Sequence, residues 1–406
     1  MRKKAYLKGY RGEILTAILE NGFIPRDIIY MYDKAKAIQM QRMIKILKDE
    51  GVIEEQKTIN KTNYLKLTNT GRELILSEAN AELAAIYNSS AIRQRIRTLA
   101  ISKPIRNKEK EIEYRTSQNK YINDTTVKIF SKLAGAKTSK ELNAKEKCSI
   151  KENSLYLDSV QIKNIGSYQA TVQNILGSQK ITNSRINGVS ITKGGVYAMY
   201  STGKNTPEWK RNGEVKMAAC IQAVVAKSVE NVDLSDYKKE AVIISKRDST
   251  FVKVIESEYK SHSQRRTLMN IDFAYEHMYS LPSSYEGIRV FRTMQLPNWQ
   301  AKIKEQLLSS KEIKESNYVS VSCDGYDKRE GIYKLIYCIP DMTKLKSFSK
   351  RAAIDEERDK YHIYCYESQL PLIRAVTRNG KYAKLFVVNM DGMEEELYKD
   401  IHYQAM

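Results

Sequence analysis

A carboxylate and a lysine two residues apart are the clearest side chains that could do chemistry in this sequence. Glu214 and Lys216 follow Asn187-Gly188 along the chain, and Asp324-Gly325 begins a similar stretch further on. Two carboxylates can hold Mg²⁺ beside a scissile phosphate, while a lysine steadies the attacking water or the developing charge. Glu214, Lys216 and Asp324 are therefore the candidate catalytic residues, and Mg²⁺ is the cofactor that such a reaction would need.

The order of these residues resembles that of restriction-endonuclease-like nucleases, in which an acidic residue at a turn is followed by Glu-x-Lys on the next strand. The chain departs from this order in two ways. Asn187 occupies the first acidic position, and asparagine is a weaker metal ligand. The segment around Glu214 has the pattern of a helix, and no Glu-x-Lys follows Asp324. A Glu–Lys pair of this kind is more often a surface feature of a basic helix.

Other familiar catalytic patterns are missing from the sequence. It contains no glycine-rich phosphate loop with a following Lys-Ser/Thr, and no GxSxG turn. The four histidines form no HxH or HExxH cluster. The five cysteines are scattered without a CxxC pair, which favours reduced thiols over a zinc site or a disulfide framework. No metal site is therefore predicted, apart from the Mg²⁺ of a nuclease.

The charge balance favours a polyanionic partner. The 406 residues have a formal net charge of +20. Such an excess favours nucleic acid or an anionic membrane surface, and an inert basic surface is the alternative. No apolar run approaches the twenty or so residues that span a bilayer, and no apolar core or cleavage site follows the basic N-terminus. We therefore expect a cytoplasmic protein without a membrane partner.

Residues 11–75 show the order helix, short helix, long helix, strand, polar tip, strand, helix. Asn21-Gly22 ends the first helix, because glycine tolerates the left-handed conformation there. Asp33 is a good N-cap for the long helix, which has an inward stripe of Ala37, Met40, Ile44 and Leu47. The pattern L-K-D-E-G-V-I … Y-L-K-L-T-N-T-G-R-E-L resembles the winged helix-turn-helix DNA-binding family. The resemblance implies a long helix in a major groove and a wing on a neighbouring phosphate backbone.

Basic and amide side chains of this region predict the contacts to double-stranded DNA. Cations on the long helix can neutralise phosphates, while Gln39 and Arg42 have the donor geometry for base edges. A protein–protein module with a solvated charged face is the alternative. The predicted DNA-binding residues are Lys34, Lys36, Gln39, Arg42 and Lys45 on the long helix, Lys57 and Lys61 on the wing, and Arg93, Arg95 and Arg97 beyond it.

The fold class that we expect is α+β, with a winged helix followed by a mixed α/β part. Residues 1–90 form the winged-helix domain, and 91–150 form a basic connector with one short helix near 127–133, either a solvated linker or a DNA-tracking arm. Two α/β domains follow at 151–290 and 291–406, as loosely duplicated and restriction-endonuclease-like units. The clearest strands are 195–201, 241–245, 331–339, 361–366 and 383–390.

The combination of these parts resembles the replication-relaxation proteins of plasmids and other mobile elements. The winged-helix pattern and the run SRINGVSITKGGVYAMYSTG … W … E-V-K support the likeness. It implies a sequence-specific DNA-binding protein of a plasmid, phage or integrative element, acting in replication initiation, mobilisation or their regulation. The alternatives are a Mg²⁺-dependent nickase or relaxase and a transcriptional regulator with a C-terminal oligomerisation domain. A homo-oligomer is compatible with each.

Overall fold

The chain folds into two compact units of mixed α and β structure. Unit 1 comprises Met1–Leu133 with Ser283–Tyr285, and unit 2 comprises Ala134–Pro282 with Glu286–Met406. The computed structural model describes residues 6–102, 106–138, 154–162, 184–203, 209, 211–228, 238–256 and 274–404. None of the helices described in these ranges has the length and apolar character needed to cross a membrane.

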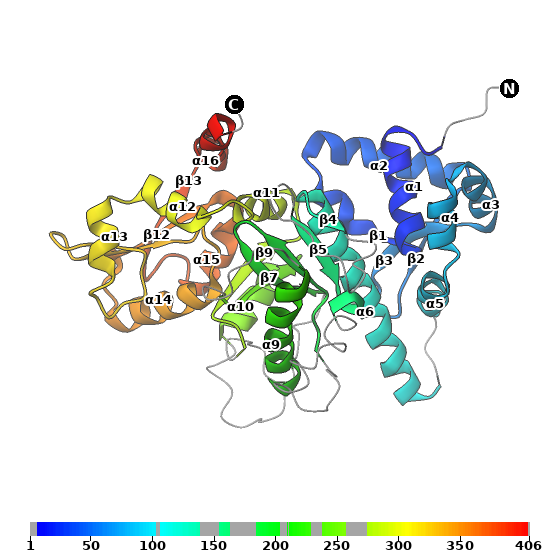
Figure 1. Ribbon diagram of the computed structural model, residues 1–406. Coiled ribbons are helices and arrows are strands. Elements are labelled where there is room, and N and C mark those ends of the chain that lie inside the picture. Colours follow the sequence, from blue (N-terminus) through cyan, green and yellow to red (C-terminus); the bar gives the residue numbers. More distant parts are fainter. Residues whose placement is uncertain are drawn as a thin grey trace. The chain divides into compact units, whose positions relative to one another are not determined.

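Unit 1 begins with the helices and the hairpin expected from the sequence (Figure 1). Gly22 ends the first helix in the left-handed conformation, with φ at 81°. The short second helix is a 3-10 helix. Strand β3 lies between β1 and β2 in an antiparallel three-stranded sheet. The elements in order are α1 (Gly9–Asn21), β1 (Ile24–Pro25), η1 (Arg26–Met31), α2 (Lys34–Asp49), β2 (Ile53–Lys57) and β3 (Asn63–Leu67).

The remainder of unit 1 is helical, so its residues up to 133 differ from the basic connector that we expected at 91–150; residues 103–105 and 139–150 of that segment lie outside the described residues. Four helices follow the hairpin: α3 (Asn69–Glu78), α4 (Ala81–Tyr87), α5 (Ser90–Leu99) and α6 (Lys108–Leu133). The short helix expected near 127–133 is the end of α6, which has 26 residues. Leu99 of α5 and Ile122 of α6 pack in one core cluster with Phe23 and Tyr64. The sequence hid this because the first half of α6 is polar on nearly all sides, so its periodicity was weak.

Unit 2 contains a six-stranded sheet and a four-stranded sheet, and all five of the strands predicted from the sequence are present. The larger sheet has the order β4-β5-β6-β7-β8-β9, with β4 (Lys137–Thr138), β5 (Leu155–Asp158), β6 (Gly188–Thr192), β7 (Gly195–Thr202), β8 (Glu240–Ser245) and β9 (His277–Pro282). The smaller sheet has the order β10-β11-β12-β13, with β10 (Gly325–Asp327), β11 (Ile332–Ile336), β12 (Tyr361–Tyr366) and β13 (Lys384–Val388).

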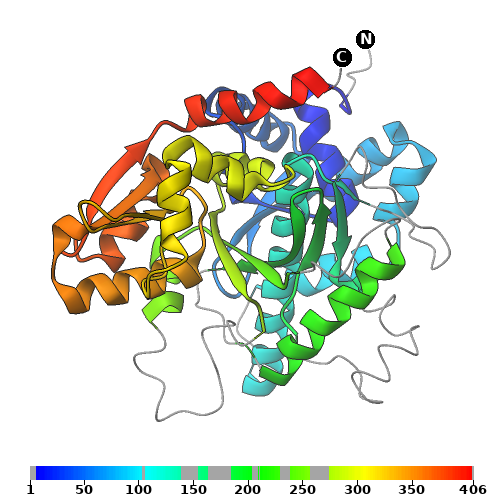
Figure 2. The same ribbon diagram turned by 60° about the vertical axis from the view of Figure 1, so that its left-hand side comes forward.

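Helices cover these sheets and share one continuous apolar core. That core joins residues of both sheets, from Leu155 to Ala383, so the two α/β domains expected at 151–290 and 291–406 form a single compact unit. Helix α16, red in Figure 2, contacts α12. The helices are α9 (Arg211–Ser228), α10 (Asp248–Glu256), α11 (Tyr285–Met294), α12 (Trp299–Leu307), α13 (Ser310–Ser316), α14 (Met342–Asp355), α15 (Leu370–Val376) and α16 (Met390–Gln404).

One order of elements occurs twice in unit 2. An antiparallel hairpin, β6-β7 or β10-β11, is followed by two strands that extend the sheet in parallel. The connecting helices are α9 and α10 in the first series and α14 and α15 in the second, and α11 or α16 closes each series. The described residues thus show a repeat of elements. Its origin by duplication stays a prediction.

Candidate nucleic-acid interface

Helix α2 presents one face to solvent because its opposite face is packed in the core. Asp33 begins the helix, and its side chain accepts a hydrogen bond of 2.9 Å from the backbone N–H of Lys36. Met40, Ile44 and Leu47 recur at helical spacing and are at most 2% exposed. Their burial fixes the rotation of the helix about its axis, so the residues on the far side must face solvent.

The exposed face of α2 is basic. Its side chains recur at intervals of three or four residues, and all are exposed: Lys34, Ile38, Gln41, Arg42, Lys45 and Lys48. Among the described residues, neither Arg42 nor Lys45 forms an ion pair. The face therefore has positive charge that the described part of the chain does not neutralise.

Three of the five predicted α2 residues belong to this face, and two do not. Lys34, Arg42 and Lys45 are exposed, whereas Lys36 and Gln39 are partly buried beside the core stripe. The ammonium group of Lys36 lies 2.8 Å from the carboxylate of Glu13 and 4.9 Å from the centre of the Tyr32 ring. The charge of Lys36 is thus compensated inside unit 1.

The tip of the β2-β3 hairpin is fastened to α6. Gln118, which is fully buried, accepts a 3.0 Å hydrogen bond from the backbone N–H of Ile59, and its amide group donates to the carbonyls of Thr98 and Ile101. Asn60 donates to Asn119 at 2.8 Å. The hairpin is therefore held in a fixed position, and its predicted contacts Lys57 and Lys61 both remain exposed.

The predicted arginines beyond the hairpin belong to α5 rather than to a linker. Arg93 donates from Nε to the carbonyl of Asn88 at 2.7 Å, and the guanidinium of Arg95 lies 5.6 Å from the centre of the Tyr121 ring. Arg97 is exposed. These contacts hold Arg93 and Arg95 against unit 1, and only Arg97 extends freely from the helix among the described residues.

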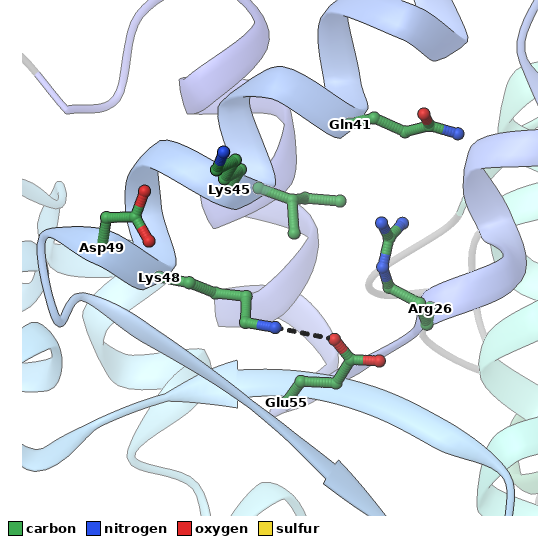
Figure 3. Close-up of a pocket in the computed structure, with 7 residues that line it drawn as sticks. Arg26, Gln41, Lys45, Lys48, Asp49 and Glu55 are labelled. Atoms are coloured by element: carbon green, nitrogen blue, oxygen red, sulfur yellow. Dashed lines mark hydrogen bonds and ion pairs between the residues drawn. The ribbon is translucent and has the colours of Figure 1, made fainter.

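A hollow of about 180 Å³ lies between α2 and β2 (Figure 3). It is lined by Arg26, Gln41, Ile44, Lys45, Lys48, Asp49 and Glu55. Lys48 and Glu55 form an ion pair of 2.9 Å at its edge. Burial alone would raise the pKa of Glu55, but the hydrogen bond and charge of Lys48, with help from Arg26 and Asn63, lower it below its usual value. Glu55 is therefore ionised at neutral pH.

Sequence reasoning missed several residues of this region. Gln41 and Lys48 could have been found, because they continue the spacing that begins at Lys34 and runs through Lys45. The same spacing places Lys36 with Met40 and Ile44, on the buried side. Arg26 had no such signal, since it comes from η1 and reaches the hollow only through the tertiary fold.

Glu214 and Lys216, proposed as catalytic, lie on a helix. Both belong to α9, and β7, which precedes it, contains no Glu-x-Lys. Glu214 is fully buried and accepts hydrogen bonds from Tyr200 OH at 2.6 Å, from the Arg185 N–H at 2.8 Å and from Ser184. Burial raises the pKa of Glu214 despite these donors. Glu214 thus joins α9 to neighbouring segments, away from solvent.

Asp324 also has protein partners of its own. It is 2% exposed, and one carboxylate oxygen lies 2.6 Å from Lys344 Nζ and 2.9 Å from Lys304 Nζ. The other oxygen accepts from the backbone N–H of Ile336 at 3.0 Å. Burial would raise its pKa, but the two ammonium groups lower it. Asp324 shares none of these partners with Glu214.

The structure therefore does not assemble the three residues proposed as catalytic into a Mg²⁺ site. Within the described ranges, no group of three or more histidine, cysteine, aspartate and glutamate side chains is arranged to hold a metal ion. Comparison with known proteins finds no matching family model, no matching curated protein and no matching solved structure.

Proposed function

We propose that the chain is a sequence-specific double-stranded DNA-binding protein in which unit 1 is a winged helix-turn-helix. The observation that carries the proposal is the exposed basic face of α2, beside a hairpin that α6 holds in place. An α-helix fits the major groove of B-form DNA, and its side chains can then reach base edges. Gln41 has a donor and an acceptor for such contacts, and Arg42 has donors.

Electrostatics support a duplex over a protein as the partner of this face. Lys34, Arg42 and Lys45 have no acidic neighbour among their exposed companions before Asp49, at the last turn of the helix. Phosphates neutralised by such cations release counterions, which favours binding at low salt. The overall net charge of +20 acts in the same direction at long range.

The biological setting is part of the proposal and rests on the resemblance alone. In that setting the protein belongs to a plasmid, phage or integrative element and acts in replication initiation, mobilisation or their regulation. Unit 1 selects the site. Unit 2 supplies further DNA contacts or joins copies of the chain, for which its buried, compact core provides a rigid support.

A charge-reversal experiment on the full chain tests the proposal. A fluorescent duplex is first selected by the protein from a random pool, and binding is measured by anisotropy over a range of salt concentrations. The double variant R42E/K45E should bind roughly 10–100-fold more weakly at moderate salt, with a salt slope smaller by about 2.

The matched control is K108E/K110E, which makes the same change in net charge on the exposed first turn of α6. In Figure 1 this end of α6, next to α5, lies far from α2. Acidic side chains are also tolerated at a helix N-terminus. Equal loss of affinity in both double variants would show that only overall charge matters. A parent chain that selects no duplex would overturn the proposal directly.

A further inference from the structure

The hollow between α2 and β2 has a surplus of one positive charge. Three basic side chains line it, Arg26, Lys45 and Lys48, together with two acidic ones, Asp49 and Glu55. The ion pair between Lys48 and Glu55 neutralises two of these charges. A ligand that enters the hollow therefore meets an environment matched to a single negative charge, which is the charge of one phosphodiester group.

Arg26 has a hydrogen-bonding group that no described residue satisfies. Its Nη1 atom is buried, and within the part of the chain that the structure describes it has no hydrogen-bond partner. A buried donor without an acceptor destabilises the folded state. Figure 3 shows the guanidinium of Arg26 pointing toward Gln41, with Lys45 on the opposite side of the hollow. An anion in the hollow would give this guanidinium the acceptor that it lacks.

The position of the hollow identifies the source of that anion. If α2 enters a major groove and the β2-β3 hairpin lies at the neighbouring groove, the sugar–phosphate strand between the grooves must pass between α2 and β2. The hollow lies there. A base edge, by contrast, would be reached by the outermost side chains of α2, such as Arg42, which is not part of the lining.

We propose that the hollow binds one backbone phosphate of the DNA duplex, with Arg26 and Lys45 as its donors. Guanidinium groups suit this task because their planar fork matches two oxygens of a phosphate. Arg26 is then a positioning contact: it fixes the register of α2 in the groove without reading a base. The inference rests on the proposed function, whose failure would remove the duplex altogether.

The test replaces single phosphates of the selected duplex, one at a time, by uncharged methylphosphonates. The parent chain should lose about tenfold in affinity at one backbone position that contacts the hollow. Arg26→Gln should lose a similar factor on the unmodified duplex, have a salt slope smaller by about 1, and lose most of its sensitivity to methylphosphonate at that same position, where only Lys45 then remains as a donor. Arg26→Lys should keep part of the sensitivity, and a circular dichroism melt shows whether each variant is folded.

Lys36→Gln is the matched control, because it removes a lysine of α2 that pairs with Glu13 outside the hollow. This variant should remain as sensitive as the parent at the identified position. If Arg26→Gln stays as sensitive as the parent there, the phosphate proposal is wrong. The proposed function still stands in that case, provided that R42E/K45E loses duplex affinity as expected. If Arg26→Gln instead selects a different base, Arg26 reads sequence and the phosphate proposal is likewise overturned.

Discussion

Asn187 and Asp324 occupy the same place in the two strand-helix series of unit 2, but only one of them is charged. Each stands just before the first strand of an antiparallel hairpin. The backbone N–H of Asn187 donates to Met199, and its side-chain oxygen accepts from the Ser201 N–H at 2.7 Å. The N–H of Asp324 donates to Lys334, and its side chain accepts from the N–H of Ile336. The position needs an acceptor oxygen, which an amide provides as well as a carboxylate.

The charge of Asp324 has a separate function. Lys304 of α12 and Lys344 of α14 both reach the same carboxylate oxygen, so Asp324 joins two helices to the start of β10. The charge of Asp324 is thus matched within the fold, whereas among the described residues Arg42 and Lys45 of α2 form no ion pair and Arg26 Nη1 has no hydrogen-bond partner. A carboxylate that is paired in this way stabilises the fold, whereas cations without such partners are available to bind a ligand.

Removing the carboxylate of Asp324 should therefore destabilise unit 2. Asp324→Ala leaves two lysines and a buried N–H without their acceptor, and we expect the free energy of unfolding to fall by about 3 kcal/mol. Both tryptophans of the chain, Trp209 and Trp299, are buried in unit 2, so their fluorescence during urea unfolding reports this unit alone.

A catalytic carboxylate would give another result. Acids placed for chemistry are commonly strained, and their removal leaves stability unchanged or raises it. Unchanged urea unfolding of Asp324→Ala, together with loss of Mg²⁺-dependent nicking of supercoiled DNA, would restore the nuclease hypothesis and contradict the structural role that we assign.

Asn187→Ala should cost less than Asp324→Ala. It removes one acceptor from the N–H of Ser201, for which we expect a loss of about 1.5 kcal/mol in the same fluorescence assay. The difference between the two variants measures the contribution of Lys304 and Lys344. Equal losses would mean that the two ion pairs contribute no net stability, as buried pairs sometimes do.

The order of elements in residues 11–75 and five strands of unit 2 were predictable from the sequence, whereas helix α6 and the identity of charge partners were not. Strands such as 361–366 are short runs of β-branched and aromatic residues between helical segments, and that local pattern decides their conformation. The buried stripe of α2 follows from spacing alone. In contrast, Lys304 and Lys344 lie 20 residues on either side of Asp324 in the sequence, and only the packing of α12 and α14 brings them together. The same holds for Arg26 and the hollow.

The pH dependence of the stability of unit 2 tests a second ion pair within the fold, that of His277 and Asp341. His277 Nδ1 lies 2.8 Å from the carboxylate of Asp341, which is also the N-cap of α14. This hydrogen bond raises the pKa of His277; burial and Lys344 oppose the rise, and Glu240 adds to it. Because the folded-state pKa is raised, the stabilisation is complete below the unfolded value near 6.5 and disappears as the pH rises through the folded value.

We therefore expect unit 2 to be more stable at pH 6 than at pH 8.5 by about 1 kcal/mol, measured as the urea midpoint of tryptophan fluorescence. Burial raises the pKa of Glu240, so the stability of unit 2 also falls as this group ionises with rising pH, but this fall begins at a lower pH. His277→Gln should remove most of the difference between pH 6 and 8.5. If His277→Gln retains the full difference in stability between pH 6 and 8.5, another titratable group causes that difference.

The smallest effect that we predict concerns a lysine that the sequence assigned to DNA. Lys36 lies on α2, but its ammonium group is paired with Glu13 and covered by the Tyr32 ring, so it resembles the matched charges of unit 2 more than its neighbour Lys45. Lys36→Ala should change duplex affinity by less than about threefold and leave the salt slope within experimental error, since a partly exposed ion pair contributes roughly 0–1 kcal/mol. Lys45→Ala, on the exposed face, should lower the slope by about 1. If the salt slope falls equally in both variants, DNA binding releases Lys36 from Glu13. Pairing within the fold then does not prevent a cation from contacting DNA.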